Sequence, residues 1–366
     1  MKRAKHIVVW ILLASMLLSL TACGTDSSTK KSETTEKEEA EKEETEVEEA
    51  AEVKIAALKG PTALGMLQMM HDSEEDSEEA SVEEQDSGET AKERQDSYEF
   101  TLAGSADEIL GRIIQGEFDI AAVPTNVAAT LYNKTQGAVK LAAVNTLGVL
   151  YVVETGDTVD SVSDLKGKTI YSLGQGSTPQ YALEYILRQN GLDPQNDVTI
   201  TYCKEATEVA SLMATGTAEI AVLPQPFVTS LIAQNESVRI ALDVTEEWNK
   251  VGDGSTLTMG CIVVQEAFLE EHPKAFACFM QRYEESVKFT NGDDTLEEAA
   301  QYAEDFGIIA KKEIAKKAIP ECNIVFLTGD EMKTVAGGFL SVMYDADPTS
   351  VGGTLPDDAF YYGTEE

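Results

Sequence analysis

Two stretches of alternating hydrophobic and polar residues, 98–102 and 198–202, lie one hundred positions apart, and each predicts a β-strand. A segment with the apolar spacing of an α-helix follows each stretch, and a glycine ends it in both copies. A short apolar run that stops at a proline comes next, at 119–124 and at 219–224, and predicts a second strand. The chain therefore repeats one strand–helix–strand unit.

Each copy of this unit is preceded by one more strand–loop–helix segment. In the first copy the predicted strand 53–58 leads into a helix at 63–70, and in the second copy strand 168–173 leads into a helix at 180–189. Strands that alternate with helices are typical of parallel βαβ units. The pattern therefore predicts two α/β lobes of similar construction.

Two extended apolar runs, 147–154 and 257–265, predict that the chain crosses from one lobe to the other and then returns. We expect lobe one to contain residues 53–148 and 258–366, and lobe two to contain residues 149–257. Each lobe is predicted to be a mostly parallel sheet flanked by helices, with a ligand cleft between the lobes. Two independent domains in series are the alternative, and the two crossings favour the interleaved arrangement.

One acidic segment interrupts this pattern. Residues 71–99 hold 13 acidic and 2 basic side chains, and this composition predicts a surface loop over 71–97. The whole chain has a formal net charge of −37. Such a charge argues against nucleic acid and anionic lipid surfaces as partners, because both are themselves negatively charged.

Residues 1–22 have the layout of an export signal, with a basic start, an apolar run over 7–20 and small residues before Cys23. Residues 20–23 read Leu-Thr-Ala-Cys and resemble a bacterial lipobox, which implies that Cys23 carries a lipid. Residues 23–52 hold 12 acidic and 4 basic side chains and predict a disordered acidic linker. We therefore expect a lipid-anchored protein on the extracytoplasmic face of the cell membrane. An ordinary signal peptide with a chance cysteine is the alternative.

The candidate ligand-binding residues lie where the predicted strands end and the next helices begin. Ligands of open parallel sheets bind beyond the carboxyl ends of the strands, close to the free N–H groups of the following helices. Because helix N-termini favour negative charge, we expect a small anionic organic ligand. The predicted binding residues are Gly60, Pro61, Thr62, Gly104, Ser105, Thr125, Asn126, Asn145, Thr146, Gly176, Ser177, Thr178 and Gln225.

Some of these positions have a structural alternative. Ser177 and Thr178 could act only as helix N-caps, without touching a ligand. Lys59 and Lys204 are the only basic side chains at these strand ends, and each could pair with a ligand anion or remain in solvent.

Few residues could support catalysis or metal binding. The chain has only three histidines, His6, His71 and His272, which argues against a histidine-based zinc cluster and against a Ser-His-Asp triad. The glycines at 174 and 176 do not begin a dinucleotide fingerprint, because Pro179 stands where the third glycine belongs. We therefore expect no catalytic residue, no metal and no cofactor.

Four cysteines remain besides the lipid-bearing one. Outside the cytoplasm they could form disulfides, or they could stay free and buried, and both alternatives are open at this point. They are Cys203, Cys261, Cys278 and Cys322.

Four motifs carry a resemblance to a known family. They are KIAALKGPT at 54–62, GEFDIAAVP at 116–124, DLKGK at 164–168 and GQGST at 174–178. From Val53 onward the chain resembles the periplasmic-binding-protein type II superfamily, and in particular its branch of sulfonate, taurine, nitrate and thiamine-precursor binding proteins.

This resemblance implies the extracytoplasmic solute-binding protein of an ABC importer, a monomer that delivers its ligand to a permease and ATPase complex. It implies binding without enzymatic activity. Two alternatives stay open, namely a ligand-binding sensor or adhesin module without a transporter, and an enzyme on the same fold.

Overall fold

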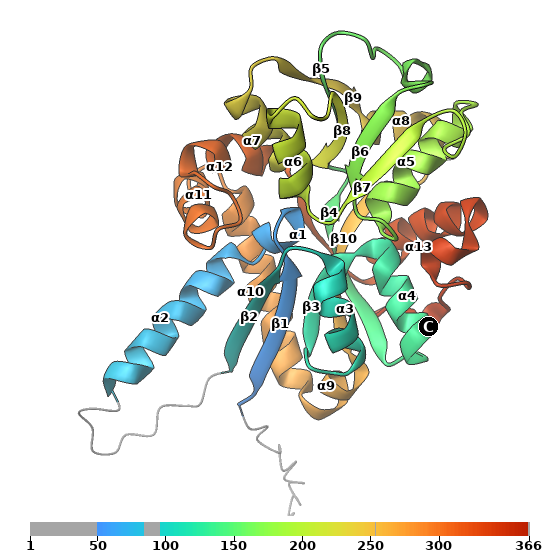
Figure 1. Ribbon diagram of the computed structural model, residues 1–366. Coiled ribbons are helices and arrows are strands. Elements are labelled where there is room, and N and C mark those ends of the chain that lie inside the picture. Colours follow the sequence, from blue (N-terminus) through green and yellow to red (C-terminus); the bar gives the residue numbers. More distant parts are fainter. Residues whose placement is uncertain (1–49, 84–95, 253, 365–366) are drawn as a thin grey trace, which may run out of the picture. The chain divides into compact units, whose positions relative to one another are not determined.

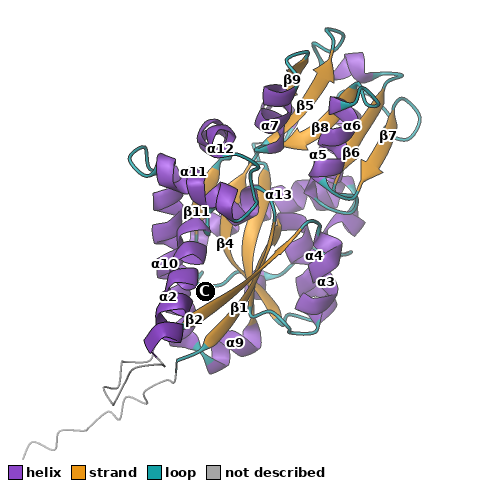
Figure 2. Ribbon diagram, turned by 60° about the vertical axis from the view of Figure 1, so that its left-hand side comes forward, coloured by secondary structure: helices purple, strands orange, loops and turns teal. Residues whose placement is uncertain are grey.

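Two β-sheets form the framework in the computed structural model, which describes residues 50–83, 96–252 and 254–364 (Figures 1 and 2). The first sheet has six strands in the order β11-β4-β10-β3-β1-β2. Strand β1 runs parallel to β2 and β3, whereas β10 runs antiparallel to β3 and β4. The strands are β1 (Glu52–Leu58), β2 (Ser97–Ala103), β3 (Ile120–Pro124), β4 (Val139–Leu147), β10 (Thr258–Gln265) and β11 (Ile324–Leu327).

The second sheet has five strands in the order β7-β6-β8-β5-β9. Strand β6 runs parallel to β7 and β8, and β5 runs antiparallel to β8 and β9. The central strands β3 and β8, one in each sheet, are buried over their whole length. The strands are β5 (Leu150–Thr155), β6 (Thr169–Leu173), β7 (Thr199–Cys203), β8 (Ile220–Pro224) and β9 (Val238–Asp243).

The predicted α/β class with two helix-flanked sheets is confirmed, but both sheets are mixed rather than mostly parallel. The antiparallel strands β5 and β10 are those at which the chain crosses between the sheets. Strand β5 enters the second sheet directly after β4 of the first sheet, and β10 brings the chain back to the first sheet. A strand that enters without a crossover helix is not constrained to run parallel to its neighbours. The expected boundaries near residues 148 and 257 lie between β4 and β5 and between α8 and β10.

Helices cover both faces of the first sheet (Figure 2). On one face α2, α10 and α11 pack against Ile55 and Ala57, and on the other α4 and α13 pack against Ala56 and Ala121. The helices are α1 (Pro61–Leu64), α2 (Leu67–Glu83), α3 (Ala106–Ile114), α4 (Thr125–Thr135), α5 (Thr178–Gln189), α6 (Ala206–Ala214), α7 (Phe227–Gln234), α8 (Val244–Val251), α9 (Glu266–Glu271), α10 (Pro273–Asn291), α11 (Leu296–Asp305), α12 (Lys312–Ala318) and α13 (Gly329–Ala346), with short 3₁₀ turns η1 (Val162–Leu165), η2 (Ile319–Glu321), η3 (Pro348–Val351) and η4 (Asp358–Phe360).

The predicted loop over 71–97 is wrong in its first part, because these residues continue helix α2 to Glu83. Residues 67–83 contain neither glycine nor proline, and their many glutamates are good helix formers. Leu67 and Met70 are buried, while His71 stacks on the Tyr302 ring at a centroid distance of 4.0 Å. The acidic side chains at 72 and 74–76 are exposed, so in this part of the helix the acidic composition marks an exposed face. Residues 84–95 lie outside the described residues, as do the predicted signal and linker up to residue 49.

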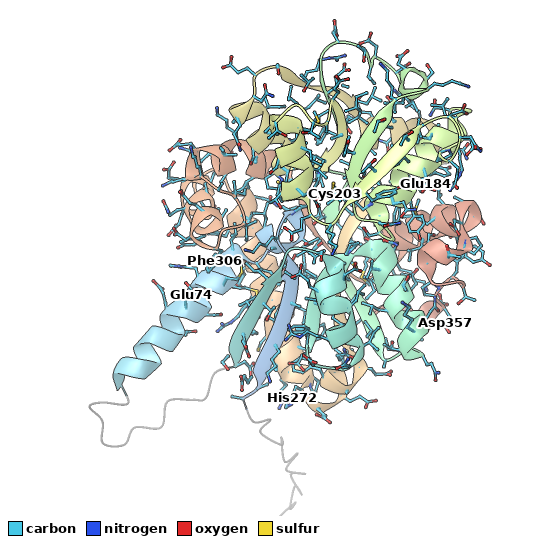
Figure 3. The ribbon with its side chains drawn as sticks, in the orientation of Figure 1. Glu74, Glu184, Cys203, His272, Phe306 and Asp357 are labelled. Carbon is cyan, nitrogen blue, oxygen red and sulfur yellow. The ribbon has the colours of Figure 1, made fainter. Side chains whose placement is uncertain are left out.

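The described cysteines are free, which answers the question of disulfides for these four positions. Cys203, at the end of β7 (Figure 3), Cys261 and Cys322 are buried, and Cys278 is exposed. Burial raises the pKa of the Cys261 and Cys322 thiols, so both stay protonated and pack as small apolar groups. Within the described ranges, no helix is long and apolar enough to cross a membrane.

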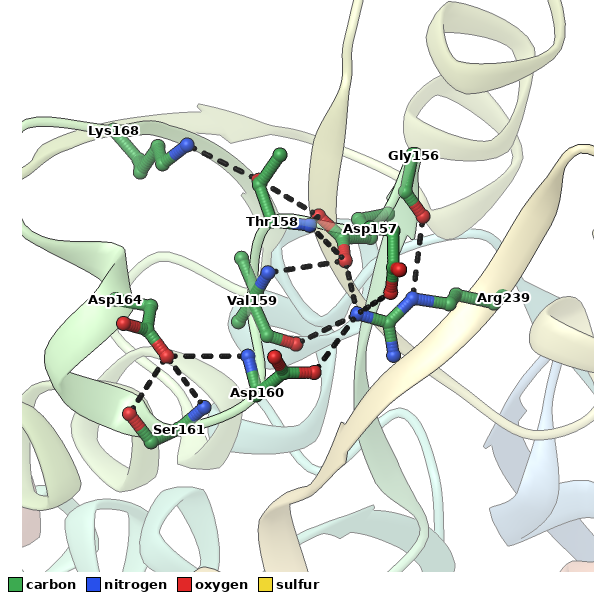
Figure 4. A network of polar contacts seen from close by, with 10 residues as sticks. Gly156, Asp157, Thr158, Val159, Asp160, Ser161, Asp164, Lys168 and Arg239 are labelled. Atoms are coloured by element: carbon green, nitrogen blue, oxygen red, sulfur yellow. Dashed lines mark hydrogen bonds and ion pairs between the residues drawn. The ribbon is translucent and has the colours of Figure 1, made fainter.

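A buried ion pair anchors the turn after β5 in the second sheet (Figure 4). The Glu154 carboxylate is 1% exposed and lies 2.5 Å from the guanidinium of Arg239 on β9. It also accepts hydrogen bonds from the backbone N–H groups of Thr158 and Val159 at 3.0 and 3.1 Å. Burial would raise the pKa of Glu154, but these N–H groups and Arg239 together hold it below its usual value. The carboxylate therefore stays charged and holds the turn.

Candidate ligand-binding site

The loops at the carboxyl ends of the strands face each other across the two sheets. A side chain added at Gly60 would reach the Phe227 ring at 3.6 Å, and one at Gly104 would reach the Glu205 carboxylate at 3.0 Å. On the other side, the Asn126 amide donates to the Gly176 carbonyl at 3.3 Å. Loops predicted from sequence to bind a ligand are thus brought together from both sheets.

The pairing of these loops follows the internal repeat in a crossed manner. In the first copy, Gly60 lies in the loop after the first strand, β1. It lies against Phe227, which begins helix α7 after the third strand of the second copy, β8. The loop at Asn126 after β3 meets the loop at Gly176 after β6, and the two middle loops meet each other. Two similar sets of strand ends therefore oppose each other in reverse order.

A cluster of neutral polar side chains surrounds Gly260 on β10. A Cβ atom at Gly260 would lie 2.5 Å from Thr62 Cγ2, 2.6 Å from Asn145 Oδ1 and 3.2 Å from Thr146 Oγ1. Asn145 Nδ2 donates to the Thr62 carbonyl at 3.2 Å, and Thr146 Oγ1 donates to Asn145 Oδ1 at 3.0 Å. Only a glycine at 260 lets these three side chains approach β10 so closely. The structure thus gathers three of the predicted residues.

Buried hydroxyl groups without a hydrogen-bond partner lie at the same strand ends. Thr125 begins α4 directly after Pro124, which pairs with Gly260, and its Oγ1 is buried beside the Cys261 thiol without a hydrogen bond of good geometry among the described residues. The Tyr283 hydroxyl likewise makes no hydrogen bond of good geometry within the described part of the chain, although it lies near the Asn145 side chain, and it is 2.7 Å from the place where a Cβ of Gly65 would lie. A buried hydroxyl group without a hydrogen-bond partner destabilises the fold, so it is expected to have a partner when the protein functions. Both could donate to a ligand oxygen.

The Tyr283 hydroxyl remains protonated at every physiological pH. Burial raises its pKa above the usual value, although the neighbouring Asn145 amide acts in the opposite direction. The sequence analysis missed Tyr283 and Gly260. Tyr283 lies on α10 among apolar residues at helical spacing, and that pattern alone indicates a core position.

Several other predicted residues have partners within the protein. The Ser177 hydroxyl donates to the Gly174 carbonyl at 2.8 Å, and the Ser105 hydroxyl donates to Glu108 at 3.0 Å as part of a capping box. Gln225 Oε1 accepts from the Thr229 hydroxyl at 2.9 Å. These side chains hold the local turn or helix start, which is the structural alternative named above for Ser177.

The loop before α5 has its own support. The Gly176 N–H donates to Gln180 Oε1 at 2.8 Å, and Gln180 Nε2 donates to Glu184 at 2.8 Å. Glu184, on α5 (Figure 3), also pairs with Arg188 at 2.7 Å. This chain of contacts fixes the backbone of the loop that faces Asn126.

The charges near the facing loops are few. The two lysines at the strand ends, Lys59 and Lys204, are both exposed. The side chains around Gly260 carry only hydroxyl and amide groups, so this polar cluster is uncharged. The Glu205 and Glu108 carboxylates both lie within 3.3 Å of the Cβ position of Gly104. In the described ranges, no group of three or more His, Cys, Asp or Glu residues could hold a metal ion.

Comparison with known proteins points to one class. A family model of the periplasmic phosphonate substrate-binding protein of ABC transporters matches residues 90–301, more than half of the chain. The putative binding protein YtlA of Bacillus subtilis (strain 168) is 27% identical over 125 residues, which are 33% of this chain and 37% of that protein. The match thus spans little more than a third of this relative.

Solved structures show the same fold at low sequence identity. An ABC transporter protein from Parabacteroides distasonis is 24% identical, with a TM-score of 0.64 over 85% of this chain and 98% of that one. The alkanesulfonate-binding protein of Xanthomonas axonopodis pv. citri, bound to MOPS, is 14% identical, with a TM-score of 0.62 over 85% and 96%. The periplasmic nitrate-binding protein of Synechocystis PCC 6803 is 13% identical, with a TM-score of 0.53 over 75% and 69%.

Proposed function

We propose that this chain, which belongs to the family of periplasmic phosphonate substrate-binding proteins of ABC transporters, holds a small anionic organic molecule between its two sheets and delivers it to a membrane permease and ATPase complex. The observation that carries this proposal is the meeting of the strand-end loops of both sheets. A molecule held there would touch both sheets at once, and its contacts would favour the closed arrangement.

The chemistry of the polar cluster supports an oxyanion as the ligand. Thr125 and Tyr283 each bring a buried hydroxyl that makes no hydrogen bond of good geometry within the described part of the chain, and both hydroxyls are neutral donors. Helices α4 and α5 begin at the facing loops, and a helix start favours negative charge. Relatives that bind alkanesulfonate and nitrate support the same ligand class. Binding involves no catalytic step and no cofactor, and the binding unit is a single chain.

We expect Thr125→Val and Tyr283→Phe each to weaken ligand binding about ten- to hundredfold. Each substitution removes one hydroxyl and keeps the shape of the side chain, and a hydrogen bond to a charged group is worth about 1.5–3 kcal/mol. Isothermal titration with methylphosphonate, ethanesulfonate and any anion that co-purifies with the protein measures the change.

Tyr98→Phe is the matched control for these two variants. Its hydroxyl is also buried and unpartnered among the described residues, but Tyr98 lies on β2 between Phe279 and Arg282. We expect this variant to bind as the wild type does. The proposed site is wrong if Thr125→Val and Tyr283→Phe keep wild-type affinity for an anion that the protein binds.

We further propose that a lipid on Cys23 holds the protein at the extracytoplasmic face of the cell membrane. The lipobox-like residues 20–23 support this, and they lie outside the described residues. Replacing Cys23 by alanine is expected to abolish the incorporation of labelled fatty acid and to leave the precursor uncut at this position. Incorporation equal to that of the wild type would contradict the anchor.

A further inference from the structure

A single buried amide connects three separate parts of the chain. Asn126, at the start of α4, is fully buried. Its Nδ2 donates to the Gly176 carbonyl at 3.3 Å and to the Ser350 carbonyl at 2.9 Å, and its Oδ1 accepts from the Thr178 hydroxyl at 3.0 Å. Gly176 and Thr178 belong to the loop and helix start after β6 in the second sheet, and Ser350 belongs to the 3₁₀ turn η3 near the C-terminus.

These contacts use the hydrogen-bonding capacity of the Asn126 amide within the protein. Both N–H groups have an acceptor, and the carbonyl oxygen has a donor. From the second sheet, the Gly176 carbonyl accepts from the amide N–H, and the Thr178 hydroxyl donates to the amide oxygen. The Asn126 amide therefore serves as a contact between two parts of the protein. The hydroxyl of the neighbouring Thr125, in contrast, is not satisfied within the described part of the chain.

We infer that Asn126 is a latch that holds the two sheets together, and that the C-terminal segment 347–357 keeps this latch in the correct orientation. The inference rests on the proposed function, in which the two sheets close over a ligand. Because the Ser350 carbonyl accepts one N–H of the amide, the other N–H is directed at Gly176 and Oδ1 is directed at Thr178.

The C-terminal segment is itself fastened to α4. Asn133 Nδ2 donates to the carbonyls of Val351 and Thr354, both at 2.8 Å, and the Tyr132 hydroxyl bonds to Asp357 (Figure 3). Gly352 has a φ of +84°, and a Cβ at this position would lie 3.0 Å from the Thr130 backbone. The position of Ser350 relative to α4 is therefore determined by several contacts that do not involve the second sheet.

The latch predicts that closure is favoured before any ligand binds. When the sheets separate, the amide exchanges its two partners on the second sheet for water, and a hydrogen bond within the protein is on balance more favourable than one to water. A bound ligand would then dissociate more slowly than it would if its own contacts alone held the sheets together. Asn126 acts here as a positioning residue for closure.

The test measures opening in the absence of ligand. Spin labels at Asp107 on α3 and Gln189 on α5, both exposed, would report the distance between the sheets after the exposed Cys278 is replaced by serine. We expect mainly short distances in the wild-type background. In Asn126→Ala and Thr178→Val, we expect the ratio of short to long distances to fall about tenfold. Thr178→Val is the milder variant, because valine has the shape of threonine and removes a single donor.

Asn133→Ala is the matched control, because it removes three bonds to the same C-terminal segment and none to the second sheet. Since Asn126 and Tyr132 still hold the segment to α4, we expect Asn133→Ala to open far less than Asn126→Ala. Three results would each overturn the latch: wild-type distances in Asn126→Ala and Thr178→Val, an equal opening in Asn133→Ala, or a wild-type protein that is already open. A failure of methylphosphonate and ethanesulfonate to bind would instead count against the proposed function, since the distances are measured without them.

Discussion

Gly260→Ala is expected to weaken ligand binding about a hundredfold or more, and to lower the free energy of unfolding by about 1–3 kcal/mol through overpacking. The added methyl group would lie 2.5 Å from Thr62 Cγ2 and 2.6 Å from Asn145 Oδ1. Moving the Asn145 side chain breaks its bond to the Thr62 carbonyl, and rotating the Thr62 side chain breaks the bond from Thr62 Oγ1 to the Leu58 carbonyl at 3.2 Å. Two or more ligand contacts would then be lost together, each worth about 1.5–3 kcal/mol when the ligand is charged.

Gly111→Ala serves as the control for this substitution. Gly111 lies within α3, and a Cβ there meets nothing within 4 Å. In a helix interior this change raises stability by about 0.5–1 kcal/mol, and we expect unchanged affinity. Titration with methylphosphonate and ethanesulfonate, together with urea unfolding, separates the two effects. Normal affinity in Gly260→Ala would show that the polar cluster around Gly260 does not contact the ligand.

Arg239→Met is expected to lower the free energy of unfolding by about 3 kcal/mol, which is the lower end of the cost of removing one partner from a buried ion pair. The Glu154 carboxylate is 1% exposed and would lose the cation with which it pairs, while Arg239 is 34% exposed, so the full cost is not reached. Urea unfolding at pH 7 measures the change. Adding Glu154→Gln to Arg239→Met should restore part of the stability, because no buried charge then remains.

The pH dependence of stability gives a second measurement on the same pair. The pKa of Glu154 is lowered in the folded wild type, so its contribution is present above the unfolded pKa and is lost as pH falls through the folded pKa. In Arg239→Met the carboxylate loses this support, and acid can protonate it more easily. The difference in stability between variant and wild type should therefore shrink below about pH 4. An equal difference at pH 7 and pH 3.5 would show that Glu154 is not the cause.

The repeat in the sequence predicted most of the fold because each copy carries its own local signals. Alternation, helical spacing and terminal glycines or prolines are properties of short segments, so β2 and β7 and the helices after them could be placed directly. The motifs shared with the binding-protein superfamily led to the class that the family model confirms. The start of α2 was predicted, but its acidic continuation beyond residue 70 was missed, because composition was given more weight than helix propensity.

The candidate site could be predicted only in part, since strand ends are visible in a sequence and contacts between distant segments are not. Thr62, Asn145 and Thr146 were named from their positions after strands and do gather at one place. Gly260 lies against these side chains and Tyr283 lies near Asn145, both from parts of the chain more than one hundred positions away, and nothing in their local sequence marks this position. Asn126 was named as a ligand contact, but its amide already has protein partners.

The crossed pairing of the strand-end loops amounts to an approximate two-fold axis between the sheets. A frame with such an axis would present nearly the same surroundings to both ends of a bound molecule. The direction in which a ligand lies must therefore be set where the two copies differ. The middle loops differ most plainly, because Gly104 and Ser105 of one copy stand opposite Lys204 and Glu205 of the other. This asymmetry gives the site a polarity that the repeated scaffold lacks.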